Sequence, residues 1–285
     1  MDIIRTVTQM QAFTTGRRKN GKSVGLVPTM GALHQGHLSL LALARENADV
    51  AVLSIFVNPT QFGPREDLAK YPRPFDEDVR LAAQHGCDAV FAPADVEMYP
   101  EGYQTFVEVG AITELLCGAS RPGHFRGVAT VVCKLFNAVQ PDCAVFGHKD
   151  AQQALVIRRM TADLNMPVRI IVAPTVREAD GLAMSSRNRY LSRDERAAAC
   201  CLYQGLVDAS DRFAKGERAS APLKRLVADT IGSTGLLDVE YIEIVDTPSF
   251  RPVETIAEKA LLAIAVRTKQ TATRLIDNIM LGGTL

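Results

Sequence analysis

The sequence lacks a net charge, because its 32 lysines and arginines are matched by 32 aspartates and glutamates among 285 residues. This balance argues against a protein that coats nucleic acid or an anionic membrane. No apolar run approaches the roughly 20 residues that a membrane-spanning helix needs. The N-terminal segment Met1-Asp2-Ile3-Ile4-Arg5 lacks the apolar core of a signal peptide. Six cysteines include no CxxC pair, which favours reduced thiols. We therefore expect a soluble, cytoplasmic protein without nucleic-acid or membrane partners.

Two domains are expected from the length of the chain and from its 47% content of hydrophobic residues. Over the first 175 residues, short apolar runs alternate with amphipathic helical stretches, a pattern typical of strands buried on both faces of a parallel sheet. The apolar runs cover residues 23–28, 50–57, 89–93, 143–147 and 168–174. We predict an α/β, Rossmann-like N-terminal domain over residues 1–175, which binds its ligands at the carboxyl ends of the strands.

The remaining residues, 176–285, have a different pattern. A long helix is expected to begin near Ser192, and a second helix is expected over residues 222–231. Three strand-like runs follow at residues 239–245, 261–266 and 274–280. Because their connections are short, we predict a smaller α+β domain that contains a short antiparallel sheet.

The strongest functional signal is Pro28-Thr29-Met30-Gly31-Ala32-Leu33-His34-Gln35-Gly36-His37, between the first buried run and a helix. Free amides at the helix start favour an anion such as phosphate. His34 and His37 can both donate hydrogen bonds to one phosphate as its charge grows. The segment is not a P-loop, because His37-Leu38 replaces Lys-Ser/Thr, and no GxGxxG is present. The alternatives are a capping pair or a metal site, for which no third ligand at zinc spacing is evident.

Two further segments carry groups suited to phosphate. Gly147-His148-Lys149-Asp150 ends a predicted strand, and Lys149 offers a point charge. Met184-Ser185-Ser186-Arg187 is a short basic loop rich in hydroxyl groups. Taken singly, the first could be an ordinary exposed turn and the second a solvated linker with a helix cap. Together with the histidine segment they indicate ATP-dependent transfer at one rim of the sheet.

Two other segments are candidates for substrate binding. Asn58-Pro59-Thr60-Gln61-Phe62 follows the second predicted strand, and Arg121-Pro122-Gly123-His124-Phe125-Arg126-Gly127 is expected to form a polar loop. Gln153, one turn into a helix after Asp150, could face the same pocket. Alternatively, both glutamines could only satisfy backbone groups. Residues 76–78, Asp-Glu-Asp, could be no more than a solvated helix start.

These motifs resemble the pantothenate synthetase (pantoate–β-alanine ligase) family. His34-Gln35-Gly36-His37 resembles the HxGH signature of the wider nucleotidyltransferase superfamily, and Met184-Ser185-Ser186-Arg187 resembles its KMSKS-type mobile loop. The matching segments are residues 28–37, 58–62, 121–128, 147–150 and 175–188. The resemblance implies that ATP is bound by Met30, Gly31, Ala32, Leu33, His34, Gln35, Gly36, His37, Gly147, His148, Lys149, Asp150, Val176, Met184, Ser185, Ser186 and Arg187.

The resemblance also implies a reaction. The family condenses (R)-pantoate with β-alanine, using ATP and a pantoyl-adenylate intermediate, and releases pantothenate, AMP and pyrophosphate. His34, His37, Lys149 and Arg187 are then the expected catalytic residues. The expected substrate-binding residues are Gln61, Gln153, Asn58, Arg121 and His124. Mg²⁺ is expected mainly on the ATP phosphates, with no protein ligands assigned, and the protein is expected to be a homodimer.

One departure from the family pattern surrounds the lysine. The family usually has GEKDY, whereas His148 and Ala151 replace the acidic and aromatic residues here. A ring at position 148 that faced the phosphates would add a titratable charge, but a backbone contact there would change little.

Two rival functions remain open at this point. One is a nucleotidyltransferase that moves a nucleotide onto a phosphorylated precursor and stops there. The other is a regulatory module that binds ATP without turning it over. Exchange of pyrophosphate into ATP that depends on a carboxylic acid separates the ligase from both.

Overall fold

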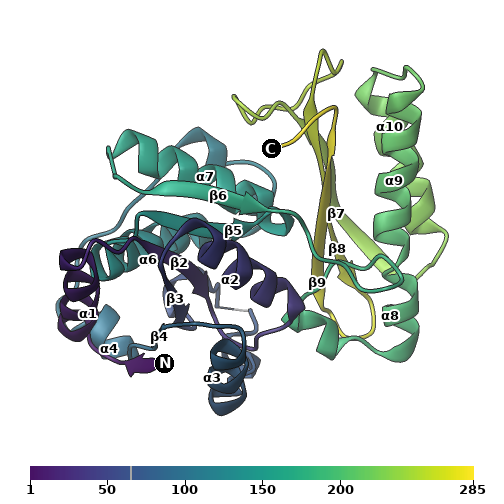
Figure 1. The fold of residues 1–285 in the computed structure, drawn as a ribbon. Coiled ribbons are helices and arrows are strands. Elements are labelled where there is room, and N and C mark those ends of the chain that lie inside the picture. The colour runs from purple at the N-terminus through teal and green to yellow at the C-terminus, as the bar shows by residue number, and fades with distance from the viewer. Residues whose placement is uncertain (65) are drawn as a thin grey trace. The chain divides into compact units, whose positions relative to one another are not determined.

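The computed structural model describes residues 1–64 and 66–285, which form two compact units (Figure 1). The first unit comprises Met1–Glu114, Arg121–Gly147 and Gln152–Pro174. The second unit comprises Leu115–Ser120, His148–Ala151 and Thr175–Leu285. The main part of the second unit thus begins at Thr175, and two short segments from the middle of the chain join it. The division into domains at residues 175 and 176 stays a prediction.

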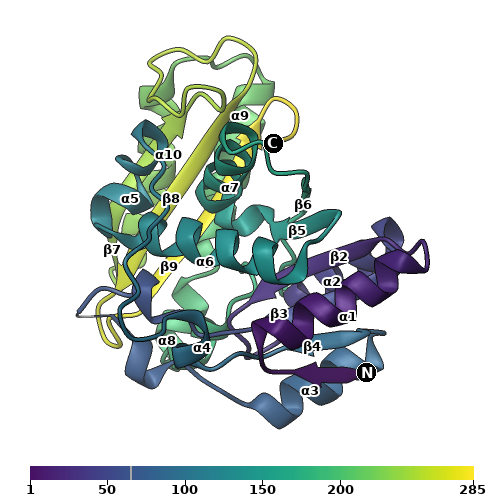
Figure 2. The same ribbon diagram turned by 90° about the vertical axis from the view of Figure 1, so that its left-hand side faces the viewer.

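The first unit is built on a parallel sheet. Its strands are β1 (Asp2–Ile4), β2 (Val24–Thr29), β3 (Val50–Ile55), β4 (Ala89–Phe91), β5 (Cys143–Gly147) and β6 (Arg169–Ala173). Their order is β1-β4-β3-β2-β5-β6, and every neighbouring pair is parallel. Figure 2 shows β1 beside β4 at one edge. The predicted α/β fold is confirmed. Only β1 was not predicted, because three residues carry too little pattern.

Helices connect these strands. They are α1 (Val7–Lys19), α2 (Gln35–Asn47), α3 (Phe75–Gln84), α4 (Asp95–Met98), α6 (His124–Val139) and α7 (Ala151–Asp163), with short 3₁₀ turns η1 (Pro59–Gln61), η2 (Leu68–Lys70) and η3 (Ala111–Thr113). Right-handed crossovers place α2 and α3 on one face of the sheet and α1, α6 and α7 on the other. Side chains from β2, β3, β4 and β5 meet those of α2 and α3 in one buried cluster.

The direction of the strand order reverses at β2. The chain goes from β2 to its neighbour β3 on one side, and β5 lies on the other side of β2. Because β2 and β5 are parallel neighbours, their carboxyl ends lie at the same edge, where open α/β sheets bind ligands. Two of the three segments expected to bind ATP follow these two strand ends.

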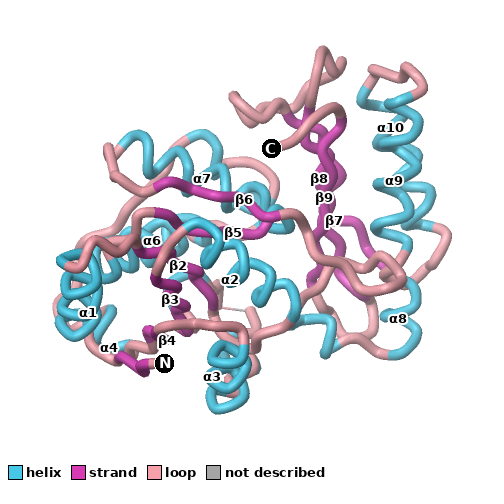
Figure 3. The backbone as a smooth tube through the Cα atoms, in the orientation of Figure 1, coloured by secondary structure: helices cyan, strands magenta, loops and turns pink. Residues whose placement is uncertain are grey.

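The second unit contains a three-stranded antiparallel sheet in the order β7 (Leu237–Val245), β8 (Ala260–Thr268) and β9 (Arg274–Leu281). Its helices are α5 (Cys117–Ser120), α8 (Arg193–Ala198), α9 (Cys201–Ala214) and α10 (Ser220–Gly232), with 3₁₀ turns η4 (His148–Asp150) and η5 (Ser186–Tyr190). Figure 3 shows α9 and α10 beside the strands. The predicted antiparallel sheet is confirmed, and the long helix predicted from Ser192 is divided into α8 and α9.

Within the residues that the structure describes, no helix combines the length and the apolar character needed to cross a membrane.

A buried carboxylate fixes the turn between β8 and β9. Glu195, which is fully buried, accepts hydrogen bonds from the backbone amides of Gln270 (2.7 Å) and Thr271 (3.0 Å) and from Oγ1 of Thr271 (2.7 Å). It also closes a capping box with Ser192 at the start of α8. Burial alone would raise the pKa of Glu195, but the hydrogen bonds from Thr271 and Gln270 overcome this effect and hold the pKa at about 2.

We predict that Glu195→Gln lowers the free energy of unfolding at neutral pH by about 1–3 kcal/mol, since the amide leaves buried donors unsatisfied. The folded-state pKa is depressed, so the stabilisation by Glu195 is present above its unfolded pKa and is lost as pH falls from about 4.5 toward 2. The difference in the free energy of unfolding between the wild type and Glu195→Gln should therefore become smaller as the pH falls over this range. Urea unfolding at several pH values measures it, with the exposed Glu258→Gln as a charge-matched control. A difference independent of pH would contradict the role of the carboxylate.

Candidate active site

The two histidines of the HxGH segment form a reciprocal cap at the start of α2. Nδ1 of His34 accepts a hydrogen bond from the amide of Gly36 (3.2 Å), and Nδ1 of His37 accepts one from the amide of His34 (3.3 Å). The ring centroids lie 4.1 Å apart. A neutral imidazole whose Nδ1 accepts a hydrogen bond carries its proton on Nε2. The cap therefore sets both histidines in the tautomer that can donate from Nε2 to an anion.

A carboxylate that the sequence analysis missed holds the turn before this cap. Asp78, from α3 and 1% exposed, accepts hydrogen bonds from the amides of Ala32 (2.8 Å) and Leu33 (2.7 Å). Gly31 and Ala32 both have positive φ, of 82° and 51°. A Cβ on Gly31 would lie 2.8 Å from Oδ2 of Asp78, so glycine is required there. The interpretation of residues 76–78 as a solvated helix start is wrong for Asp78. Because Asp78 follows two other acidic residues at the start of a helix, nothing in the sequence marks it as the residue that holds the turn before the histidines.

Gln61 lies at the end of η1, and its side chain is held from two sides. Its Oε1 accepts a hydrogen bond from Nδ2 of Asn58 (3.1 Å), and its Nε2 points at Sδ of Met30 (3.0 Å). Since a thioether is a weak acceptor, the Nε2 donor can be given up to a ligand at little cost. The structure therefore brings Met30, from the histidine segment, into contact with Gln61.

Helix α6 packs directly against the backbone that carries Gln61. A Cβ on Gly127 would overlap the carbonyl of Thr60 and lie 2.7 Å from Cα of Gln61, so only glycine allows this approach. The carbonyl of Gly127 also accepts a hydrogen bond from Asn58 (3.1 Å). The polar loop predicted over residues 121–127 is wrong at its end, since α6 begins at His124 and Gly127 is buried.

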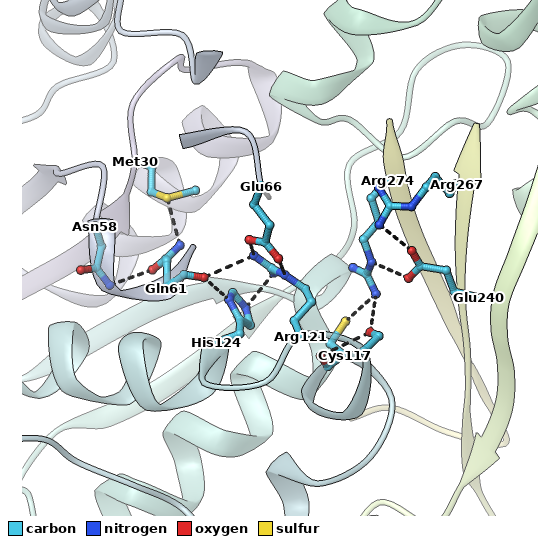
Figure 4. A network of polar contacts seen from close by, with 11 residues as sticks. Met30, Asn58, Gln61, Glu66, Cys117, Arg121, His124, Glu240, Arg267 and Arg274 are labelled. Carbon is cyan, nitrogen blue, oxygen red and sulfur yellow. Dashed lines mark hydrogen bonds and ion pairs between the residues drawn. The ribbon is translucent and has the colours of Figure 1, made fainter. Parts of the chain in front are cut away.

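A network of side chains fixes the carbonyl of Gln61, as Figure 4 shows. The carbonyl accepts hydrogen bonds from His124 Nδ1 (2.9 Å) and Arg121 Nη2 (3.4 Å), and Arg121 Nη1 lies 3.0 Å from His124 Nε2. Arg121 also makes a two-pronged ion pair with Glu66 (2.7 and 2.6 Å). Burial would raise the pKa of Glu66, but the hydrogen bonds and charge of Arg121 prevail and lower it. Glu66 is the second residue that the sequence analysis missed.

The contacts of Asn58 and Arg121 indicate that these two residues position Gln61. Asn58 is 1% exposed, and its Oδ1 accepts from Thr60 Oγ1 (2.9 Å) and Tyr99 (2.8 Å) while its Nδ2 makes the two bonds described above. Direct substrate contacts of Asn58, Arg121 and His124 stay a prediction. Gln153 is half-buried on α7, and its contact with substrate is likewise a prediction.

In the second unit, the backbone of the lysine segment is tied to strand β9. The carbonyls of His148 and Lys149 accept hydrogen bonds from Nδ2 of Asn278, at 3.1 and 2.9 Å. The ring atom Nε2 of His148 is buried, and Ala151 is 3% exposed at the start of α7. The structure thus describes a backbone contact at position 148.

The segment with Met184, Ser185, Ser186 and Arg187 is also tied at its base. The amide of Met184 bonds to the carbonyl of Val176 (3.0 Å). Ser185 caps η5 by accepting from the amide of Arg187 (3.2 Å). Asn188 then bonds to Glu178 (2.9 Å), which pairs with Arg196 (2.6 Å). These contacts make residues 175–190 a folded hairpin.

Two polar atoms near the ends of this hairpin are buried. Oγ1 of Thr175 and Oδ1 of Asn188 are buried without a hydrogen-bond partner among the described residues. They flank in sequence Val176 and the stretch from Met184 to Arg187, the residues of this hairpin that are expected to bind ATP.

Within the first unit, the structure joins the histidine segment to Gln61 through Met30. His34, His37, Met30, Gln61 and the residues that support them belong to the first unit, and Lys149 and Arg187 belong to the second. The meeting of the two groups on one triphosphate therefore stays a prediction.

Comparisons with known proteins agree on one family. A sequence profile described as Pantoate-beta-alanine ligase matches residues 2–280. The pantothenate synthetase of Pelotomaculum thermopropionicum is 55% identical over 282 residues, which cover 99% of each chain. That of Thermotoga neapolitana is 51% identical over 282 residues, which cover 99% of this chain and 100% of the relative.

Solved structures give the same result. Pantothenate synthetase from Thermus thermophilus has a TM-score of 0.93 and 43% identity, with 99% of this chain and 100% of that chain covered. Pantoate-beta-alanine ligase from Francisella tularensis, complexed with Beta-gamma ATP and Beta-alanine, has a TM-score of 0.79 and 33% identity, with coverage of 98% and 97%. The chain therefore belongs to the pantoate–β-alanine ligase family.

Proposed function

We propose that this enzyme condenses (R)-pantoate with β-alanine at the expense of ATP and forms pantothenate, AMP and pyrophosphate through a pantoyl-adenylate. The observation that carries the proposal is the reciprocal histidine cap at the start of α2, the helix that follows β2, where the strand order reverses. The Francisella relative solved with Beta-gamma ATP and Beta-alanine supports the choice of substrates.

In the first step, a carboxylate oxygen of pantoate attacks the α-phosphorus of ATP, and the bond to pyrophosphate breaks. The donors on His34 and His37, with Lys149 and Arg187, offset the repulsion between the two anions and stabilise the charge that develops on phosphorus and pyrophosphate. Gln61 and Gln153 orient pantoate, so that proximity supplies much of the rate.

In the second step, the neutral amine of β-alanine attacks the acyl carbon, the bond to AMP breaks, and the amine loses a proton. Gln61 lies near β-alanine as well as near pantoate. The stretch from Ser185 to Asn188 excludes water from the adenylate, which would otherwise be hydrolysed. The remaining residues of the ATP assignment, from Met30 to His37 and from Gly147 to Asp150 with Val176, cradle the nucleotide.

Mg²⁺ belongs to the proposal as a companion of ATP, on whose phosphates it neutralises charge. Within the described residues, no group of three or more histidine, cysteine, aspartate or glutamate side chains is placed to hold a metal. Coordination through phosphate oxygens does not need such a group. A homodimer and a cytoplasmic location complete the proposal.

The reaction is tested by its products. With ATP, pantoate and β-alanine, we expect AMP and pantothenate in equal amounts, and without β-alanine we expect pyrophosphate to exchange into ATP only when pantoate is present. Chromatography and labelled pyrophosphate measure the two outcomes. Exchange without any acid would favour the nucleotidyltransferase, and binding of ATP with no turnover would favour the regulatory module.

The variant His37→Asn tests the donor at Nε2 of His37 while keeping the hydrogen bond that caps the helix. The shorter amide keeps an acceptor near the position of Nδ1 for the amide of His34, but it removes the donor at Nε2. We expect turnover to fall by about 10²–10³, the usual cost of one such donor. The melting temperature should stay close to that of the wild type, because the cap is kept.

His37→Gln is the matched control. Its longer amide reaches toward the position of Nε2 but does not reproduce the cap, so we expect more residual turnover and a lower melting temperature than in His37→Asn. Equal turnover in the two variants would remove the Nε2 donor from the mechanism.

Gly127→Ala tests the support of Gln61. The added methyl group overlaps the backbone of Thr60 and Gln61 and must displace it. We expect kcat/KM for pantoate to fall about 10²-fold, as expected for a reacting group displaced by about 1 Å. Binding of ATP, followed by calorimetry, should change little.

Gly110→Ala is the control for the glycine substitution itself, because a Cβ there meets nothing within 4 Å. Unchanged pantoate kinetics in a folded Gly127→Ala protein would show that Gln61 does not depend on this packing.

A further inference from the structure

Strand β9 carries two buried polar residues in succession. Asp277 is 2% exposed and Asn278 is 4% exposed. The backbone amide of Asn278 donates a hydrogen bond to Oδ1 of Asp277 (2.8 Å). Burial of such groups is costly unless they are hydrogen-bonded. Both residues are paired with the central strand β8, Asp277 with Ile264 and Asn278 with Ala263. Their backbone is therefore fixed by the sheet.

Asn278 reaches the lysine segment through both of its amide hydrogens. Nδ2 donates to the carbonyl of His148 at 3.1 Å and to that of Lys149 at 2.9 Å. The two carbonyls belong to η4, the turn that carries Lys149. One side chain thus sets the position of the backbone from which the lysine projects.

Asp277 reaches the hairpin of residues 175–190 through Arg177. Its two carboxylate oxygens lie 2.6 and 3.0 Å from Nη1 and Nη2 of Arg177. Arg177 in turn donates to the carbonyl of Gly181 (3.1 Å) and stacks 3.8 Å from the ring centroid of Tyr203. The arginine is thereby fixed in a rigid, two-pronged geometry at the base of the hairpin.

Adjacent residues of one strand therefore tie together two segments that are 25 residues or more apart in sequence, from Asp150 to Thr175. Both segments belong to the expected ATP site, and both lie in the second unit. We propose that Asp277 and Asn278, together the β9 clamp, are positioning residues that set Lys149 at a fixed spacing from the Met184–Arg187 segment. This inference rests on the proposed function, because it assigns Lys149 to the triphosphate.

Asn278→Leu tests the clamp. Leucine has a similar size but cannot donate, so the two carbonyls lose their partner. We expect kcat of pantoate-dependent pyrophosphate exchange to fall by about 10–10², the scale for a displaced catalytic group. The KM for pantoate should stay within about twofold, because Gln61 is held by other residues.

Thr273→Val is the matched control for loss of a buried polar group. Thr273 is 6% exposed in the turn before β9, and its hydroxyl bonds only to Thr271 among the contacts described. We expect it to lower the melting temperature without lowering kcat. A comparable loss of kcat in both variants would reduce Asn278 to a structural role and overturn the proposal.

A double-mutant cycle with Lys149→Ala gives the decisive readout. When Asn278 acts through Lys149, Asn278→Leu should lower exchange by less than about threefold in the Lys149→Ala background, because coupled residues are not additive. A full additional loss in that background would show that Asn278 acts through something else. Asn278→Ser, which leaves room for a water at the carbonyls, serves in the same cycle when the leucine variant does not fold.

The cycle also separates this inference from the proposed function. Wild-type exchange in Lys149→Ala alone would refute the assignment of Lys149 to the triphosphate, and the clamp would then have no catalytic target. A strong loss in Lys149→Ala together with wild-type kcat in Asn278→Leu would refute only the clamp.

Discussion

The candidate site depends first on the hydrogen bonds that each histidine ring accepts at the start of α2. A neutral imidazole has one donor and one acceptor, so a backbone amide on Nδ1 decides that Nε2 carries the proton. The same two bonds satisfy amides that the helix cannot satisfy itself. The bonds that cap the helix are thus the same bonds that favour a proton on Nε2 of each ring. The cap follows directly after the turn whose amides are bound by Asp78.

Buried and partly buried carboxylates organise the surroundings of the site segments in a similar way. Asp78 holds the histidine turn, Glu66 orients Arg121 beside Gln61, and Asp277 orients Arg177 at the hairpin. None of the three was assigned to the site from the sequence. Each contacts backbone amides or an arginine, so nothing in the local sequence distinguishes it from an ordinary surface acid, although Asp78 and Asp277 are buried.

This difference explains how much the sequence could predict. The family, the parallel sheet and the small antiparallel sheet were predicted correctly, because apolar runs and the HxGH segment are local patterns. Contacts such as Asn278 with Lys149 join residues 129 positions apart, and no local pattern encodes them. The start of α6 was missed for a related reason. Gly123 and Gly127 indicate a loop by composition, whereas Gly127 is required by close packing against Gln61.

The same contacts also determine the net charge beside the site segments of each unit. Arg121 is paired with Glu66 and Arg177 with Asp277, so two of the guanidinium groups near the site segments are largely neutralised by their partners. Asn278 holds two carbonyls with a neutral amide, where a lysine would add a charge. Paired ions and neutral donors fix the positions of the segments that they bind, but they add little net electric field. In a chain with no net charge, the proposed role of Lys149 at the triphosphate then depends on where this one side chain is placed rather than on the number of basic residues.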